Sequence, residues 1–104
     1  MRGRGWVLVV SMLTAVATAA AERVHTVTIE NMQFAPAVLT VRSGDRVVWV
    51  NKDLFPHTAT AADGVFVSPP IAAGGSWTYQ ADRPGRHRYD CSLHPTMQGE
   101  LTVE

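Results

Sequence analysis

The sequence predicts an all-β protein, a two-sheet antiparallel sandwich with Greek-key connections and about seven or eight strands. From Val24 onward, short runs of alternating apolar and polar residues are separated by turn residues, which is typical of sandwiches and barrels. No window has a helical period of useful length. The chain also has no internal repeat, no low-complexity tract and no sign of a second domain.

The N-terminal segment, residues 1–21, is predicted to be a secretory signal peptide. Arg2 and Arg4 precede an uncharged run that ends in small residues, with Ala19 and Ala21 at the cleavage-site positions. A retained anchor is the alternative, but this run falls short of the ~20 strongly apolar residues that spanning requires. We therefore expect export to the periplasm, a single domain at residues 22–104 and no membrane attachment after cleavage.

The first half of this domain contains three expected strands. In VHTVTIENMQF, Val27 and Ile29 fall on one face of a strand. The stretch APAVLTVRSGDRVVWVN gives two more strands, joined at residues 43–45, whose Ser-Gly-Asp composition favours a tight turn. Trp49 is expected in the core.

The second half continues with HTATA as a short strand and a loop in which Pro69 and Pro70 forbid ladder pairing. WTYQ is the next expected strand, and RHRYDC and GELTVE are the last two. Alternation places one set of side chains inward. This set comprises His87, Tyr89 and Cys91, followed by Leu101 and Val103.

Size and charge limit the class of protein further. A domain of this length is near the lower limit for a stable single core, so a disulfide or a metal is expected. The chain has one cysteine, which excludes an intramolecular disulfide and leaves a metal.

Without Arg2 and Arg4 there are seven basic residues against nine acidic ones. This balance argues against a nucleic-acid partner, since such proteins carry a basic face.

The metal ligands are expected in YDCSLHPTMQGE, near the end of the chain. Cys91, His94 and Met97 are spaced three residues apart between two strands. Separately they could be a buried small residue, a surface residue and a core filler. Together they offer a thiolate, an imidazole and a thioether around one point, and this soft set selects copper over magnesium, calcium or manganese.

A fourth ligand has to come from elsewhere, and three histidines are candidates. His87 lies about 13 Å before Cys91 at ~3.3 Å per strand residue, too far to share a metal, and His25 is given a structural role. His57 follows Pro56 at a loop-to-strand junction and is the best remaining ligand. Two imidazoles and a thiolate with a weak axial methionine describe a blue-copper electron-transfer site.

The mature chain resembles the cupredoxins, most closely amicyanin and the plastocyanin and pseudoazurin group. The resemblance is carried by VTIENMQFAPAVLTVRSGDRVVWVN, by FPHT and by PGRHRYDCSLHPTMQGELTVE. It implies that His57, Cys91 and His94 are equatorial copper ligands and that Met97 is the axial one, with one copper per chain. It also implies that His94 is the port through which electrons pass, within an apolar patch. Phe55, Pro56, Leu93 and Pro95 are the residues expected to build this patch, although simple loop packing would also explain them.

Three residues depart from the family pattern without removing a ligand. Leu93 stands where many amicyanins have proline, His87 where tyrosine is usual, and Thr58 where plastocyanin-like proteins often have asparagine. Because its hydroxyl remains, Thr58 can still tie the two ligand loops together.

The predicted function is a monomeric blue-copper shuttle for single electrons. By resemblance, its partners are redox proteins such as a periplasmic dehydrogenase and a c-type cytochrome. Two alternatives are a copper module for storage or delivery, which usually needs more methionines than Met32 and Met97, and a metal-free adhesion sandwich. An enzyme is disfavoured, because four protein ligands leave no open position on the metal.

Overall fold

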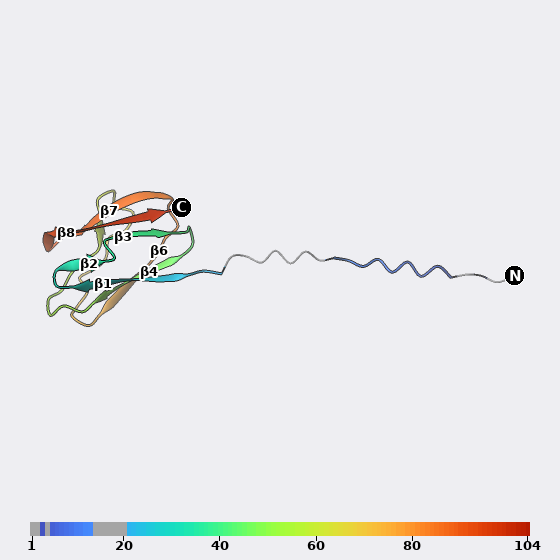
Figure 1. Ribbon diagram of the computed structural model, residues 1–104, viewed down its shortest axis with the longest axis horizontal. Helices are drawn as coiled ribbons and strands as arrows, with labels where there is room; N and C mark the ends of the chain where they lie inside the picture. Colours follow the sequence, from blue (N-terminus) through green and yellow to red (C-terminus); the bar gives the residue numbers. More distant parts are fainter. Residues whose placement is uncertain (1–2, 4, 14–20) are drawn as a thin grey trace.

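The computed structural model describes residue 3, residues 5–13 and residues 21–104, and its folded part is a β-sandwich of eight strands without helices. Strands alternate with short connections throughout this part (Figure 1). The strands are β1 (Val24–Glu30), β2 (Gln33–Ala35), β3 (Val38–Val41), β4 (Arg46–Asn51), β5 (Thr60–Ala61), β6 (Ser76–Gln80), β7 (Gly85–Cys91) and β8 (His94–Val103).

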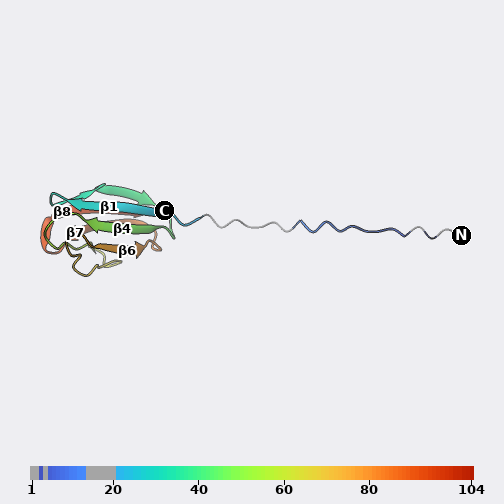
Figure 2. The same cartoon turned by 90° about the horizontal axis from the view of Figure 1, so that it is seen from below.

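The strands form two four-stranded sheets that pack face to face. The order is β2-β1-β4-β6 in one sheet and β3-β8-β7-β5 in the other. Figure 2 shows β1, β4 and β6 side by side across the first sheet. The all-β sandwich predicted from the sequence is confirmed.

Both sheets are mixed, whereas the sequence led us to expect antiparallel pairing throughout. β1 pairs with β4 in parallel, with Val27 opposite Trp49, and β3 pairs with β8 in parallel. The reason is topological. The chain leaves the first sheet after β2, adds β3 to the second sheet, and returns to place β4 beside β1 in the same direction. Alternation within a strand reports which side chains face inward, but it does not report the direction of the neighbouring strand.

The core lies between the sheets and is centred on Trp49, which is fully buried. Its ring contacts Tyr89 edge-on at a centroid distance of 5.5 Å and Phe66 at 5.3 Å. Phe34 packs edge-on against Tyr89 at a centroid distance of 4.8 Å. Aromatic pairs at these separations add stability beyond the area that they bury.

Most of the expected strand faces agree with the structure. Val27, Ile29, Leu101 and Val103 are all buried, as alternation predicted. The turn at residues 43–45 is present, with Gly44 at a φ of 96°. Three boundaries differ. VHTVTIENMQF forms two antiparallel strands, β1 and β2, with a turn at Asn31 and Met32, where one strand was expected. HTATA contributes only Thr60–Ala61 as a strand, and the last strand begins as early as His94.

His87 has a structural role, as the sequence analysis expected. Its side chain is buried, its Nδ1 contacts a carboxylate oxygen of Asp63, and its Nε2 lies 2.9 Å from the carbonyl oxygen of Arg83. Both partners are acceptors, so both ring nitrogens donate when the imidazole is charged. Burial lowers the pKa of His87, but these two hydrogen bonds outweigh it and raise the pKa above its usual value.

The raised pKa of His87 predicts a pH-dependent stability. The protonated ring stabilises the folded state fully below the unfolded pKa of about 6.5, and this contribution disappears as pH rises through the higher folded pKa. We expect the free energy of unfolding to fall across this interval, and to fall less in Asp63→Asn. Urea denaturation of both proteins over a pH series measures the difference. Equal slopes would show that Asp63 does not hold the charged ring.

The N-terminal segment contributes nothing to this core where it is described. Apolar side chains from Trp6 to Leu13 are between 69% and 93% exposed. Of the predicted signal-peptide features, Arg2, Arg4 and Ala19 lie outside the described residues. Among the described residues, no helix has the length and apolar character to cross a membrane.

Candidate metal centre

The candidate ligands meet at one end of the sandwich because of the strand directions. β7 ends at Cys91 and β8 begins at His94, with these two residues paired across an irregular turn that follows a bulge at Asp90. His57 reaches the same place from the loop between β4 and β5, where it forms an isolated bridge with Ile71. This end is opposite the one where β1 begins (Figure 1).

His57, Cys91 and His94 form a compact cluster of donor atoms. Their donor atoms all lie within 4.8 Å of one another. The Sγ of Cys91 is 3.7 Å from Nδ1 of His57 and 3.8 Å from Nδ1 of His94. His57 and Cys91 are fully buried, whereas His94 is half-buried. The structure therefore brings together the three residues that the sequence nominated as equatorial ligands.

These separations fit a metal in a trigonal arrangement. Bonds of ~2.3 Å to sulfur and ~2.0 Å to nitrogen, the lengths known for zinc, place the two donors about 3.7 Å apart when they meet at about 120°. The two observed distances match this value. One soft thiolate with two imidazoles is the donor set that copper electron-transfer sites use. The residues present therefore fit copper.

Met97 occupies the first inward position of β8. It is 2% exposed and belongs to the core cluster. The inward series continues through Leu101 and Val103 on the same strand. Met97 is thus buried three residues after His94, and its role as the axial ligand stays a prediction.

Thr58 joins the two ligand-bearing segments, as its hydroxyl was expected to do. Its backbone N–H donates to Sγ of Cys91 at 3.3 Å. Its Oγ1 accepts a hydrogen bond from the backbone N–H of Ser92 at 2.8 Å and lies 3.0 Å from the hydroxyl of that residue. Hydrogen bonding to the cysteine sulfur is one of the factors that set the redox potential of a blue-copper site.

Asp53 is a site residue that the sequence analysis missed. Its Oδ2 lies 2.9 Å from Nε2 of His57, on the side of the ring that faces away from Cys91. Backbone amides of Met32 and Asn31 donate to the same carboxylate, and the Met32 bond contributes most to lowering the pKa of Asp53. The carboxylate is consequently charged at neutral pH. In the sequence, only the position of Asp53 four residues before His57 indicated this role. Its hydrogen bonds with Asn31 and Met32 can be recognised only in the structure.

His25 lies outside the metal centre, consistent with the structural role assigned to it. Its Nε2 is 3.0 Å from Oδ2 of Asp45, next to the turn between β3 and β4. The hydrogen bond from His25, together with backbone amides, lowers the pKa of Asp45 to about 2. This pair stabilises the end of the sandwich where β1 begins.

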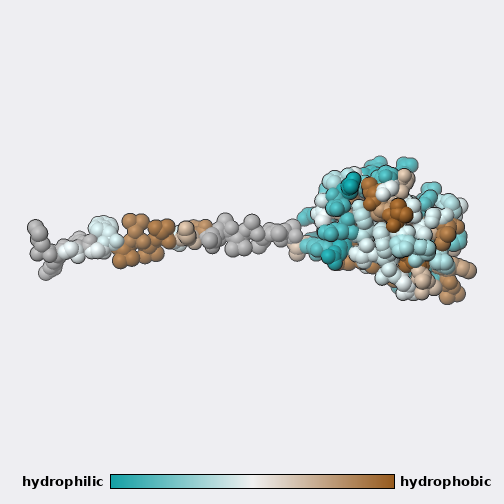
Figure 3. All heavy atoms as spheres, turned by 180° about the vertical axis from the view of Figure 1, so that it is seen from behind, coloured by the Kyte–Doolittle hydropathy of each residue, from teal (hydrophilic) through white to brown (hydrophobic). Residues whose placement is uncertain are grey.

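Exposed apolar residues flank the candidate ligands His57 and His94 in the sequence. Phe55 is 61% exposed and Leu93 51% exposed, and Pro56 and Pro95 are also exposed, as the resemblance implied. The structure adds Leu54, which is 88% exposed and which sequence reasoning did not include. Apolar atoms gather at this end of the domain in Figure 3. We call these five residues the ligand-end patch.

Comparison with known sequences identifies relatives of this chain. The family model described as a cupredoxin-like domain matches residues 4–103. Amicyanin-alpha of Methylorubrum extorquens is 28% identical over 83 residues, which is 75% of this chain and 70% of that protein. The chloroplastic plastocyanin of Tetradesmus obliquus is 31% identical over 84 residues, 68% of this chain and 58% of its own length.

Comparison with solved structures gives the same result. The copper(I) structure of an amicyanin variant in which a methionine is replaced by alanine superimposes with a TM-score of 0.74 at 27% sequence identity. The match covers 82% of this chain and 86% of the amicyanin chain. The chain therefore shares the fold of amicyanin over most of the length of both proteins.

Proposed function

The chain belongs to the cupredoxin-like family, and we propose that it is an exported blue-copper protein that carries single electrons between redox partners. The observation that supports this most directly is the cluster of Cys91 with His57 and His94, whose donor separations suit a trigonal copper site. Met97 completes the proposed ligand set. One copper is bound per chain.

Copper bound in this site supplies the one-electron chemistry, since it exchanges between Cu(I) and Cu(II). The role of the protein is to hold the donors in one arrangement for both oxidation states. Buried strand ends fix Cys91 and Met97, the Asp53 contact orients His57, and Thr58 joins the two ligand segments. Side chains locked by packing and hydrogen bonds resist the rearrangement that each oxidation state would otherwise favour.

The protein is not an enzyme. Four protein ligands leave no open position at which a substrate could bind the metal. The site lies at the end of a closed sandwich, and its histidines are committed to the metal and to Asp53.

The ligand-end patch is the proposed docking surface for redox partners. His94 is the only one of the three clustered donors that is not fully buried, and the exposed side chains of Phe55 and Leu93 belong to the patch beside it. A small apolar contact suits brief encounters, because weak redox complexes bury little area. The proposed partners are redox proteins of the class of periplasmic dehydrogenases and c-type cytochromes, and the proposed state is a monomer.

Residues 1–21 are the proposed export signal, and residues 22–104 the functional domain. The support is the basic start and small-residue end of the segment, together with the exposure of its described apolar residues. Periplasmic localisation follows from this reading.

Storage or delivery of copper is the second candidate function, because the same four ligands would serve it. Electron exchange between copies of the copper-loaded protein separates the two. A shuttle should exchange quickly between its Cu(I) and Cu(II) forms, as measured by NMR line broadening in mixtures. Phe55→Ser and Leu93→Ser should each slow the exchange roughly tenfold or more, since a penalty of about 1.4 kcal/mol at the contact gives a factor of ten.

Val38→Ser is the matched control for these variants, because Val38 is exposed on β3 and is not part of the ligand-end patch. It should leave the exchange rate unchanged. If instead copper passes to a chelator faster than electrons pass between copies, delivery replaces the shuttle as the function.

A further inference from the structure

Three hydroxyl groups form a series of contacts next to the fully buried Cys91. Oγ1 of Thr58 is 3.0 Å from Oγ1 of Thr60 and 3.0 Å from Oγ of Ser92. The backbone N–H of Ser92 also donates to Oγ1 of Thr58, at 2.8 Å. Thr58 is 4% exposed, Thr60 is half-buried and Ser92 is exposed. This hydroxyl series therefore connects β5 with the residue that follows Cys91.

We infer that Thr60 is a positioning residue for the metal centre, and that it acts through the hydroxyl of Thr58. Its own hydroxyl is the donor that holds Thr58 in the orientation that receives the N–H of Ser92. The strand β5 thereby becomes a third segment joined to the two that carry the candidate ligands. The inference rests on the proposed function only for the metal that the site binds.

The hydrogen-bonding capacity of a hydroxyl group supports this role. A threonine hydroxyl has one proton to donate and two lone pairs that accept. The N–H of Ser92 uses one lone pair of Thr58, because an amide N–H can only donate. One proton and one lone pair of Thr58 remain for the two neighbouring hydroxyls. One neighbour therefore donates to Thr58, and the other accepts from it.

The burial of the three residues determines the direction of donation. If Thr60 donates to Thr58, then Thr58 donates to Ser92, and the last proton lies on the exposed residue, where water accepts it. The reverse direction leaves the last proton on the half-buried Thr60, and withdrawing an unpaired polar group from water costs free energy. Thr60 is thus the first donor of the series. Successive hydrogen bonds of this kind polarise and strengthen one another.

Thr58 transmits this restraint to the surroundings of the sulfur. Its backbone N–H donates to Sγ of Cys91 at 3.3 Å, while its hydroxyl holds the residue that follows Cys91. Thr60 is itself anchored, because β5 pairs with β7 at Thr60 and Ala61. Without the donor from Thr60, one lone pair of Thr58 is unused and its side chain can adopt another staggered rotamer.

Thr60→Val is the sharpest test, since it removes the hydroxyl and keeps a β-branched side chain of similar shape. We expect the backbone amide of Ser92 to exchange its hydrogen about three- to tenfold faster in the variant, as loss of a typical hydrogen bond predicts. Hydrogen exchange followed by NMR on the full chain without metal measures this directly. The amide of Ala81, which donates to the carbonyl of Asp45 at the opposite end of the sandwich, should exchange at the parent rate.

The reduction potential of the copper-loaded protein gives a second measurement, because hydrogen bonding around the cysteine sulfur is one of the factors that set it. Thr60→Val and Thr58→Val should each shift the potential. Because Thr60 acts through Thr58, adding Thr60→Val to a Thr58→Val chain should cause no further shift. Thr60→Ser, which retains the donor, should keep the parent potential and the parent exchange rate at Ser92. Thr78→Val, the same change at an exposed position of β6, is the matched control and should leave both unchanged.

Three results would overturn the inference. The first is a Ser92 amide that exchanges at the parent rate in Thr60→Val. The second is equal acceleration at Ser92 and Ala81, which reveals a general loss of stability. The third is a full, additive effect of Thr60→Val on the potential of the Thr58→Val chain. Faster exchange at Ser92 alone, in a protein that gives no intense visible band with copper(II), would support the positioning role and reject the proposed function instead.

Discussion

Cys91→Ser will abolish the intense visible absorption that copper(II) gives with the parent protein. Cys91 is fully buried, and its Sγ lies at 3.7 Å and 3.8 Å from the two histidine nitrogens. A serine hydroxyl is a harder donor and stays protonated at neutral pH, so it cannot replace the thiolate. Because loss of an outer contact alone costs about 10- to 100-fold in metal affinity, loss of the thiolate should cost more than 100-fold.

The measurement is an optical titration of the purified protein with copper(II). The parent should show a band that saturates at one copper per chain and bleaches on reduction, and Cys91→Ser should show neither feature. The hydroxyl can still accept the N–H of Thr58, so we expect the variant to fold. Thr96→Ala, an exposed change in β8 between His94 and Met97, should retain the band. A coloured site in Cys91→Ser would contradict thiolate ligation and remove the basis for the electron carrier.

The structure brings together three of the four candidate ligands that the sequence predicted, His57, Cys91 and His94. Cys91, His94 and Met97 lie within one short segment, and their residue types and spacing carry the chemistry. The strands around them were equally visible, since a period of two residues determines which side chains face the core. His57 was found by excluding the other histidines, and its donor atom does lie in the cluster.

Other features depend on contacts between segments that are distant in the sequence. Asp53 meets the hairpin at Asn31 and Met32 across more than twenty residues. The parallel pairing of β1 with β4 depends on a crossover into the second sheet. Nothing in the local pattern reports either contact. Leu54 was omitted from the patch because single exposed apolar residues are common, and only its position beside Phe55 gives it meaning.

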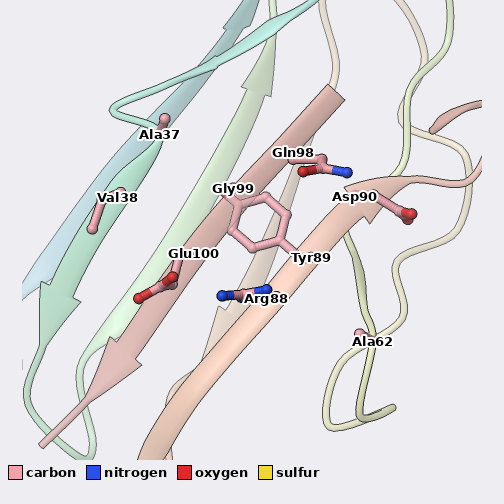
Figure 4. A pocket seen from close by; sticks show the side chains of 9 residues that line it. All are labelled: Ala37, Val38, Ala62, Arg88, Tyr89, Asp90, Gln98, Gly99 and Glu100. Carbon is pink, nitrogen blue, oxygen red and sulfur yellow. The ribbon is translucent and has the colours of Figure 1, made fainter. Parts of the chain in front are cut away.

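The segment that follows Met97 combines features that are visible in the local sequence with a contact between two strands. Tyr89 and Gly99 are paired across β7 and β8, two residues before Cys91 and two residues after Met97. The ring of Tyr89 lies across Gly99 and borders a groove of about 560 Å³ along these strands (Figure 4). Burial raises the pKa of Tyr89 to about 12. The ring therefore stays neutral and packed through the physiological range.

Gly99→Ala is expected to destabilise the protein by about 3 kcal/mol, at the upper end of the usual cost of overpacking. An added Cβ would lie 2.2 Å from Cζ of Tyr89 and 2.4 Å from its hydroxyl oxygen, so the ring must move. It has little room to move, because Phe34, Trp49 and Phe66 surround it. Urea denaturation of the copper-loaded protein measures the effect. Gln98→Ala, an exposed neighbour on the same strand, should change stability by less than about 0.5 kcal/mol.

A double-mutant cycle with Tyr89→Leu separates this clash from a general intolerance of alanine in β8. If the ring is the obstacle, Gly99→Ala should cost clearly less in the Tyr89→Leu background, because residues in contact couple by about 0.5–3 kcal/mol. Equal costs in both backgrounds would refute the clash. A displaced ring would also shift β7 against β8, and these strands carry Cys91 and Met97. The visible band of the surviving folded fraction should therefore change in Gly99→Ala and return towards that of the parent in the double variant.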